Sequence, residues 1–194
     1  MKAAPFSLVN LAYICYYVFG DDMEFTQRKP TRLQEYDYSQ SGYYFVTICA
    51  KDKQNLFGEI VGDGVYDIPQ VKLSGIGEIV NKYIRQLNTQ YNNVCIDKYI
   101  VMPNHIHLIV KISTAQKDGN TLCGTSQAPS PTNAILPKFI SLYKRYCNRE
   151  YGENLFQRSF HDHIIRNEAD YRRIWNYIDT NPAKWNEDCF YIKE

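Results

Sequence analysis

Two histidines separated by a single residue are the most specific chemical feature of the sequence. His105 and His107 lie inside the apolar run from Val101 to Val110. If this run forms a β-strand, both imidazoles project from one face while Ile106 and Leu108 point into the core behind it. Such a pair can bind a divalent metal ion. It can equally be a hydrogen-bonded structural pair, because a bare His-x-His spacing is weak evidence.

A second candidate group follows near the end of the chain, where Arg173, Tyr177 and Asn181 recur at intervals of four. On a helix this spacing places the three side chains along one side. Tyr177 is one of 17 tyrosines, and such a residue is ordinarily an aromatic at the edge of a core. Asn181 precedes Pro182, so its ordinary role is to end the helix. The spacing alone therefore identifies no nucleophile.

The composition describes one folded domain of 194 residues, with 44% hydrophobic and 22% charged residues. These values exclude a disordered, collagen-like or low-complexity chain. Lysine and arginine number 22 against 21 acidic residues, so a nucleic-acid partner would need a local basic surface. The six cysteines form no Cys-x-x-Cys pair, which disfavours a zinc ribbon or a disulfide scaffold and favours reduced thiols.

The N-terminal stretch is apolar from Phe6 to Phe19, but it is shorter than the roughly 20 residues that span a bilayer. We expect residues 1–25 to be a poorly ordered extension and residues 26–194 to form a single domain, with no membrane partner. Residues 116–132 are rich in turn-forming side chains and predict a flexible loop within that domain.

Hydrophobic periodicity predicts the elements that must position these residues. We expect strands at 43–50, 94–102 and 106–112, with 56–61 a possible short partner of the first. Pro103 and Asn104 predict a tight turn between the second and third strands. Ser74 can cap a helix that runs to about Gln90.

A second helix is expected from Thr132 or Asn133 to Tyr151, before Gly152. Its apolar face is predicted to comprise Ile135, Phe139, Leu142 and Tyr146, beside a basic stripe of Lys138, Arg145 and Arg149. A strand at 160–165 and a helix from Asn167 to Thr180 complete the set. The order of elements predicts an α+β fold of the ferredoxin-like kind, an antiparallel sheet with helices packed on it.

Four blocks in this order resemble the single-tyrosine HUH transposases of insertion sequences, and most of all the REP-associated tyrosine transposases. The blocks are Tyr43–Cys49, Met102–His107, Phe156–Asn167 and Tyr177–Trp185, and the similarity covers roughly residues 26–186. The resemblance implies an enzyme that cuts and rejoins single-stranded DNA near hairpins through a 5′-phosphotyrosine intermediate.

The resemblance also implies roles for individual residues. His105 and His107 match the two histidines of the HUH motif, and Tyr177 matches the catalytic tyrosine. Asn181 occupies the position of a third metal ligand, which is often Gln in insertion-sequence members. His163 is a competing ligand or, with Arg173, a residue that supports the ligands. The expected cofactor is Mg²⁺ or Mn²⁺, and two imidazoles with an amide oxygen suit Mn²⁺ better.

The expected partner is single-stranded DNA with a hairpin, held by a monomer or homodimer in the cytoplasm of a bacterium, at the nucleoid. Candidate phosphate contacts are the basic residues Arg28, Lys29, Arg32, Lys138, Arg145, Arg149, Arg158 and Arg166. Two alternative functions remain open: a hairpin-binding protein that cuts nothing, and a metal phosphoesterase that uses water in place of tyrosine.

Overall fold

The computed structural model describes residues 38, 40–62, 67–113 and 134–191. The predicted N-terminal extension and the predicted loop at 116–132 lie outside these residues. The elements, in chain order, are β1 Gly42–Cys49, the 3-10 helix η1 Lys51–Lys53, β2 Gly58–Val61, β3 Gln70–Leu73, α2 Gly75–Gln90, β4 Val94–Val101, β5 His105–Ile112, α3 Ile135–Tyr151, β6 His161–Ile165, α4 Glu168–Thr180 and the 3-10 helix η3 Pro182–Glu187.

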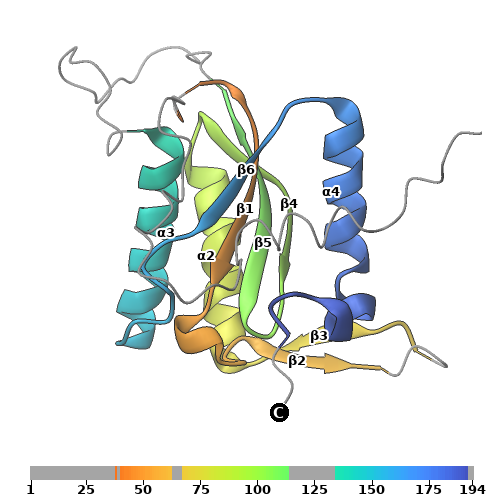
Figure 1. Cartoon of the computed structure of the whole chain (residues 1–194). Coiled ribbons are helices and arrows are strands. Elements are labelled where there is room, and N and C mark those ends of the chain that lie inside the picture. Colours follow the sequence, from red (N-terminus) through yellow and green to blue (C-terminus); the bar gives the residue numbers. More distant parts are fainter. Residues whose placement is uncertain (1–37, 39, 63–66, 114–133, 192–194) are drawn as a thin grey trace, which may run out of the picture.

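The main sheet has four strands in the order β4-β5-β1-β6, and every neighbouring pair is antiparallel. Helix α2 connects β1 with β4 by way of the small β2–β3 hairpin, and α3 connects β5 with β6 (Figure 1). This topology is that of a ferredoxin-like domain. The fold class predicted from the order of elements is confirmed.

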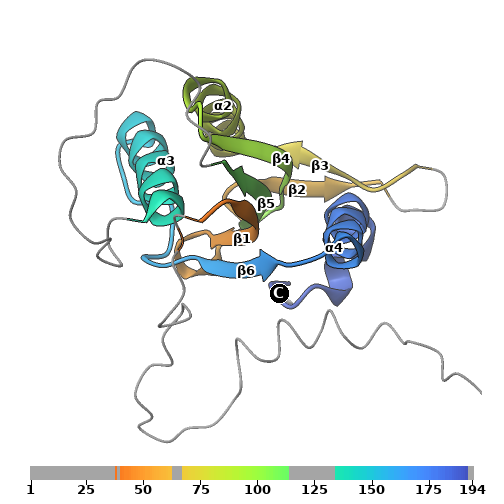
Figure 2. The same ribbon diagram turned by 90° about the horizontal axis from the view of Figure 1, so that it is seen from above.

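Helices cover the two faces of the sheet unequally (Figure 2). One face carries α2 and α3 over a large core, which takes Ile106 and Leu108 from β5. The other face carries α4 over a smaller core, which takes Phe45 from β1 and Ile109 from β5. Because strand residues alternate between faces, the two histidines of β5 lie on the α4 side.

Three details of the predicted elements are wrong. Strand β2 pairs with β3 in a separate two-stranded sheet and not with β1. Helix α3 starts at Ile135 after Ala134, which provides no side-chain cap, and the expected caps Thr132 and Asn133 lie outside the described residues. The buried face of α3 is also displaced from the predicted one, and comprises Leu136, Phe139, Ile140, Tyr143 and Cys147.

The cysteines follow the expectation of reduced thiols only in part. Cys49 and Cys147 are free and buried, and Cys95 is free and exposed. Cys189 is in a disulfide bond, so the expectation is wrong at this residue. None of the helices in the described part of the chain has the length and apolar character needed to cross a membrane.

The start of α2 shows how the small hairpin is fastened to the domain. Ser74 caps the helix as expected: its Oγ accepts a hydrogen bond from the Gly77 backbone N–H at 3.0 Å and donates one to the Leu56 carbonyl at 2.6 Å. A Cβ placed on Gly77 would lie 2.0 Å from the Phe57 carbonyl oxygen. The helix and the chain before β2 approach so closely that only glycine fits.

We expect Gly77→Ala to lower the free energy of unfolding by about 1–3 kcal/mol, because the backbone of Phe57 must move away. Gly75→Ala in the same helical turn is the matched control, since a Cβ there meets nothing within 4 Å. Equilibrium denaturation with urea measures both variants. A Gly77→Ala protein as stable as Gly75→Ala would contradict the proposed close approach.

Candidate active site

Strand β5 places the two histidines side by side in the interior. In the β1–β5 ladder His107 faces Thr47 and His105 faces Cys49. The exposed fraction of His105 is 0% and that of His107 is 1%. Two imidazoles in such a dry place need partners for their ring nitrogens, because an unpaired buried polar atom is costly.

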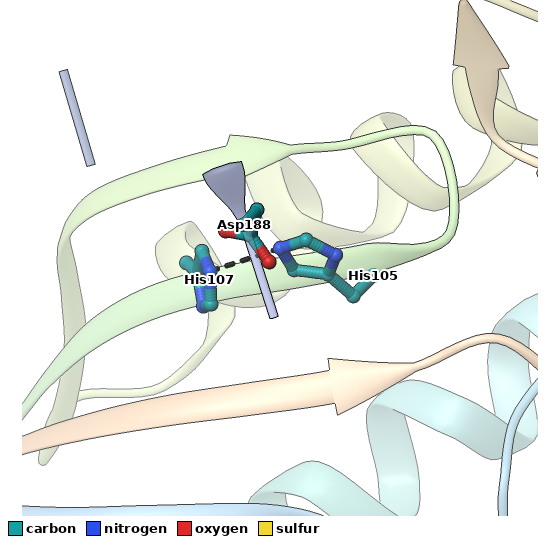
Figure 3. Close-up of side chains that lie close together, drawn as sticks. All are labelled: His105, His107 and Asp188. Carbon is teal, nitrogen blue, oxygen red and sulfur yellow. Dashed lines mark hydrogen bonds between the residues drawn. The ribbon is translucent and has the colours of Figure 1, made fainter. Parts of the chain in front are cut away.

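The ring nitrogens of the pair have distinct partners. Nδ1 of His105 is 2.9 Å from Asn104 Oδ1, and Nδ1 of His107 is 2.9 Å from Thr47 Oγ1. The two Nε2 atoms face one another at 2.9 Å (Figure 3). Each ring is thus held from behind while its Nε2 points at the other ring, an arrangement that suits two ligands of one metal ion.

Helix α4 brings Tyr177 and Asn181, the predicted nucleophile and third metal ligand, to the region of the histidine pair. Tyr177 Oη lies 3.2 Å from His107 Nε2. Asn181, one turn later, ends α4 and is 2% exposed. Its Nδ2 donates a hydrogen bond, but its buried Oδ1 has no hydrogen-bond partner among the described residues. An unpaired buried amide oxygen is a free acceptor for a cation.

Asp188 is a further site residue that sequence reasoning missed. Its Oδ2 accepts hydrogen bonds from Tyr177 Oη at 2.9 Å and from Asn181 Nδ2 at 2.8 Å. Ligand atoms of His105, His107 and Asp188 all lie within 4.8 Å of one another (Figure 3). Asp188 follows the irregular helix η3, so no helical or strand spacing links it to the other residues.

The donor set fits a divalent cation. It offers two imidazole nitrogens, one unpaired amide oxygen and one carboxylate, and this mixture suits Mn²⁺ better than Mg²⁺. Aromatic rings enclose the pair: Phe190 lies 4.5 Å from the His105 ring centre and Phe45 lies 5.1 Å from that of His107. These rings keep water away from the donors.

Burial sets the charge state of the site. It lowers the pKa of His105 to about 3, and it lowers the pKa of His107 well below the usual value, aided by His105 and opposed by Asp188. Both rings are therefore neutral at pH 7 and have lone pairs to offer. Burial, followed by the charge of Asp188, raises the pKa of Tyr177 far above that of a free phenol.

The two residues predicted to support the metal ligands, His163 and Arg173, make their contacts elsewhere. His163 Nε2 is 2.8 Å from Asp170 Oδ2, and Arg173 also pairs with Asp170. Asp170 lies in the first turn of α4, which is capped by Asn167. The three side chains thus fasten the start of α4 to β6, and within the described structure the hydrogen bonds of His163 and Arg173 go to Asp170 and not to the histidine pair.

Four of the predicted DNA-contacting residues line one open groove of about 1120 Å³ on α3 and the segment after it: Lys138, Arg145, Arg149 and Arg158. Lys144, which sequence reasoning did not select, lines it too and donates to the carbonyls of Gln157 and Ser159 at 2.8 and 2.7 Å. Burial lowers its pKa to about 8. Arg166 lies outside the groove lining, and Arg28, Lys29 and Arg32 lie outside the described residues.

Comparison with known proteins gives the following similarities. An uncharacterised protein of Haemophilus influenzae is 31% identical over 174 residues, which covers 85% of this chain and 93% of the relative. A second protein of the same organism, named as a REP-associated tyrosine transposase, is 22% identical over 76% of this chain and 74% of its own. No protein-family model matches the chain.

Among solved structures, a REP-associated tyrosine transposase bound to a REP hairpin has a TM-score of 0.54 at 20% identity. The match covers 79% of this chain and 73% of that chain. The four sequence blocks predict a similarity to the REP-associated tyrosine transposases, and these comparisons confirm that similarity.

The buried pair predicts a specific acid sensitivity. Its rings gain protons on unfolding below their ordinary pKa of 6.5, so the unfolded state binds more protons and stability falls as the pH falls. For metal-free protein in EDTA, we expect the free energy of unfolding to decrease below pH 6.5 by roughly 1 kcal/mol per pH unit for each ring.

Urea denaturation between pH 7 and pH 4 measures this slope. The double variant His105→Asn, His107→Asn lacks both rings and should have a flatter profile, whereas His163→Gln retains them and should keep the steep one. Parallel profiles for the wild type and the double variant would contradict the assignment of buried neutral rings.

Proposed function

We propose that this chain is a metal-dependent tyrosine transposase that cuts and rejoins single-stranded DNA near hairpins. The chain belongs to the same family as the Haemophilus influenzae relative that it matches at 31% identity. One observation carries the proposal. A tyrosine hydroxyl lies 3.2 Å from Nε2 of a buried histidine pair, and Asp188 links that hydroxyl to Asn181, whose amide oxygen is unpaired.

The residues that would hold a divalent cation are His105, His107 and Asn181, with Asp188 as a further oxygen donor. When bound, the cation would neutralise charge on the scissile phosphate and stabilise the ionised form of the tyrosine hydroxyl. The aromatic enclosure strengthens this electrostatic effect, because charges interact more strongly where water is excluded.

Tyr177 would be the nucleophile. Its Oη forms a bond to phosphorus while the bond from phosphorus to the 3′-oxygen breaks, which gives a 5′-phosphotyrosine and a free 3′-OH. Asp188 Oδ2 accepts the hydrogen bond of the phenol and is placed to take its proton, and the leaving oxygen gains one from water. A phenol is a far better leaving group than an alcohol, so a later 3′-OH can reverse the step without a nucleotide cofactor.

The burial of the pair sets a condition on this chemistry. Phe190 packs on His105, and its carbonyl accepts a hydrogen bond from Asn104 at 2.8 Å. A phosphate could therefore reach a cation held by this pair only after the segment around Phe190 has moved. Asp188 belongs to the same segment and must remain close enough to contact Tyr177.

The basic groove would bind the DNA backbone. Five cationic residues and a single acidic one, Glu153, line it, and no ion pair among the described residues neutralises the five. Lys138 and Arg149 are eleven residues apart on α3, or about 16 Å along the helix axis, which is comparable to about half a turn of duplex DNA. A duplex stem fits this spacing.

The first test is the formation of a covalent adduct with a single-stranded hairpin oligonucleotide in Mn²⁺, detected on a denaturing gel. We expect the adduct from the wild type and none from Tyr177→Phe, because phenylalanine has no attacking oxygen. Tyr171→Phe on the same helix is the matched control and should retain the adduct. His105→Ala should abolish cutting, since one metal ligand is removed.

The alternatives give different results in this assay. Cleavage by Tyr177→Phe without an adduct would support a phosphoesterase that uses water. Tight binding of the hairpin with no cutting by the wild type would support a DNA-binding protein, and either outcome would contradict the proposed transposase.

A second test concerns the groove. In the Tyr177→Phe background, the double variant Arg145→Gln, Arg149→Gln should bind the hairpin more weakly. The slope of log K, the association constant, against log salt concentration should also fall by about 2, because each arginine no longer neutralises one phosphate. Fluorescence anisotropy over a series of NaCl concentrations measures the slope. Arg172→Gln, an exposed arginine of α4 paired with Glu168, is the control. An unchanged slope in the double variant would exclude the groove as the DNA site.

A further inference from the structure

Asn104, in the turn between β4 and β5, is a buried residue that the proposed chemistry does not use. It is 1% exposed and lies directly before His105. Its Nδ2 donates hydrogen bonds to the carbonyl of Phe190 at 2.8 Å and to that of Lys53 at 3.2 Å. Its Oδ1 is 2.9 Å from His105 Nδ1.

These contacts define which way the amide of Asn104 points. Carbonyl oxygens only accept hydrogen bonds, so the NH₂ group must face Phe190 and Lys53. The opposite orientation would place three oxygens together. Oδ1 therefore faces His105, and because an amide oxygen can only accept, the hydrogen of this contact must be on Nδ1 of the ring.

The two histidines differ in whether the partner of Nδ1 fixes the position of the ring hydrogen. The partner of His107 Nδ1 is the hydroxyl of Thr47, which can donate or accept by rotating its hydrogen. With Nδ1–H on His105, its Nε2 carries a lone pair, and the 2.9 Å contact between the two Nε2 atoms requires the hydrogen to be on His107. In the absence of metal the neighbouring rings are thus opposite tautomers.

We propose that Asn104 is a positioning residue that locks His105 in the Nδ1–H tautomer, so that its Nε2 lone pair is always available to a metal ion. The Thr47 hydroxyl, in contrast, lets His107 change tautomer when the ion binds. This inference rests on the proposed function only in taking the pair as metal ligands. The neutral ring of His107 moves its hydrogen from Nε2 to Nδ1, where Thr47 Oγ1 then accepts it, and the net charge of the ring does not change.

Nitrogen-15 NMR of histidine-labelled protein, assigned ring by ring, reads the tautomers directly and requires no DNA cleavage. In EDTA we expect His105 as Nδ1–H and His107 as Nε2–H. After addition of diamagnetic Zn²⁺, both rings should be Nδ1–H with Nε2 bound. A wild-type His105 that carries its hydrogen on Nε2 in EDTA would overturn the proposal, whether or not the protein cuts DNA.

Two variants separate this role from simple bracing of the turn. Asn104→Leu and Asn104→Asp both lack the hydrogen bonds to Phe190 and Lys53, but only Asp keeps an acceptor for His105 Nδ1. Calorimetric titration with Mn²⁺ should show a 10- to 100-fold weaker affinity for Asn104→Leu and rescue by Asn104→Asp, with circular dichroism to check folding. Equally weakened affinity in the two folded variants would overturn the proposal.

Discussion

The site depends on one constraint, which is that β5 is covered on both faces and still carries two imidazoles. Alternation along the strand directs Ile106 and Leu108 to the core under α2 and α3, and so directs His105 and His107 to the side of α4. In that dry layer every ring nitrogen must be paired or bind an ion. The close Nε2 contact of the two rings follows from their spacing and from this requirement.

Helix α4 completes the site because it is anchored by packing. Ile174 and Ile178 join Phe45 and Ile109 in the smaller core, and their positions on the helix set where its polar side falls. Tyr177 immediately precedes one of these anchors, so its hydroxyl is held by a rigid element and not by a loop. Rigid placement matters for the proposed chemistry, since an attacking oxygen gains most from correct alignment before reaction.

Local periodicity made much of this arrangement predictable. The spacing of His105 and His107 on a strand, and of Tyr177 and Asn181 on a helix, needs only the geometry of each element. Asp188 was not predictable, because it reaches the site through an irregular segment whose path depends on tertiary packing. On α3 the predicted face and the buried face are both apolar, so periodicity alone does not select the buried one. Tyr146 of the predicted face stacks on Tyr83 at the edge of the core. Strand β3 is only four residues long and gives little signal, so the sequence does not indicate that it is the partner of β2.

The central claim is that the histidine pair, Asn181 and Tyr177 form one metal centre in a single chain. Anomalous diffraction from crystals grown with Mn²⁺ tests it most directly. We expect one peak within bonding distance of both Nε2 atoms and of Asn181 Oδ1, with Tyr177 Oη beside it. Well-ordered crystals with no manganese at the pair, or with the pair still in direct hydrogen-bond contact at saturating Mn²⁺, would contradict the claim.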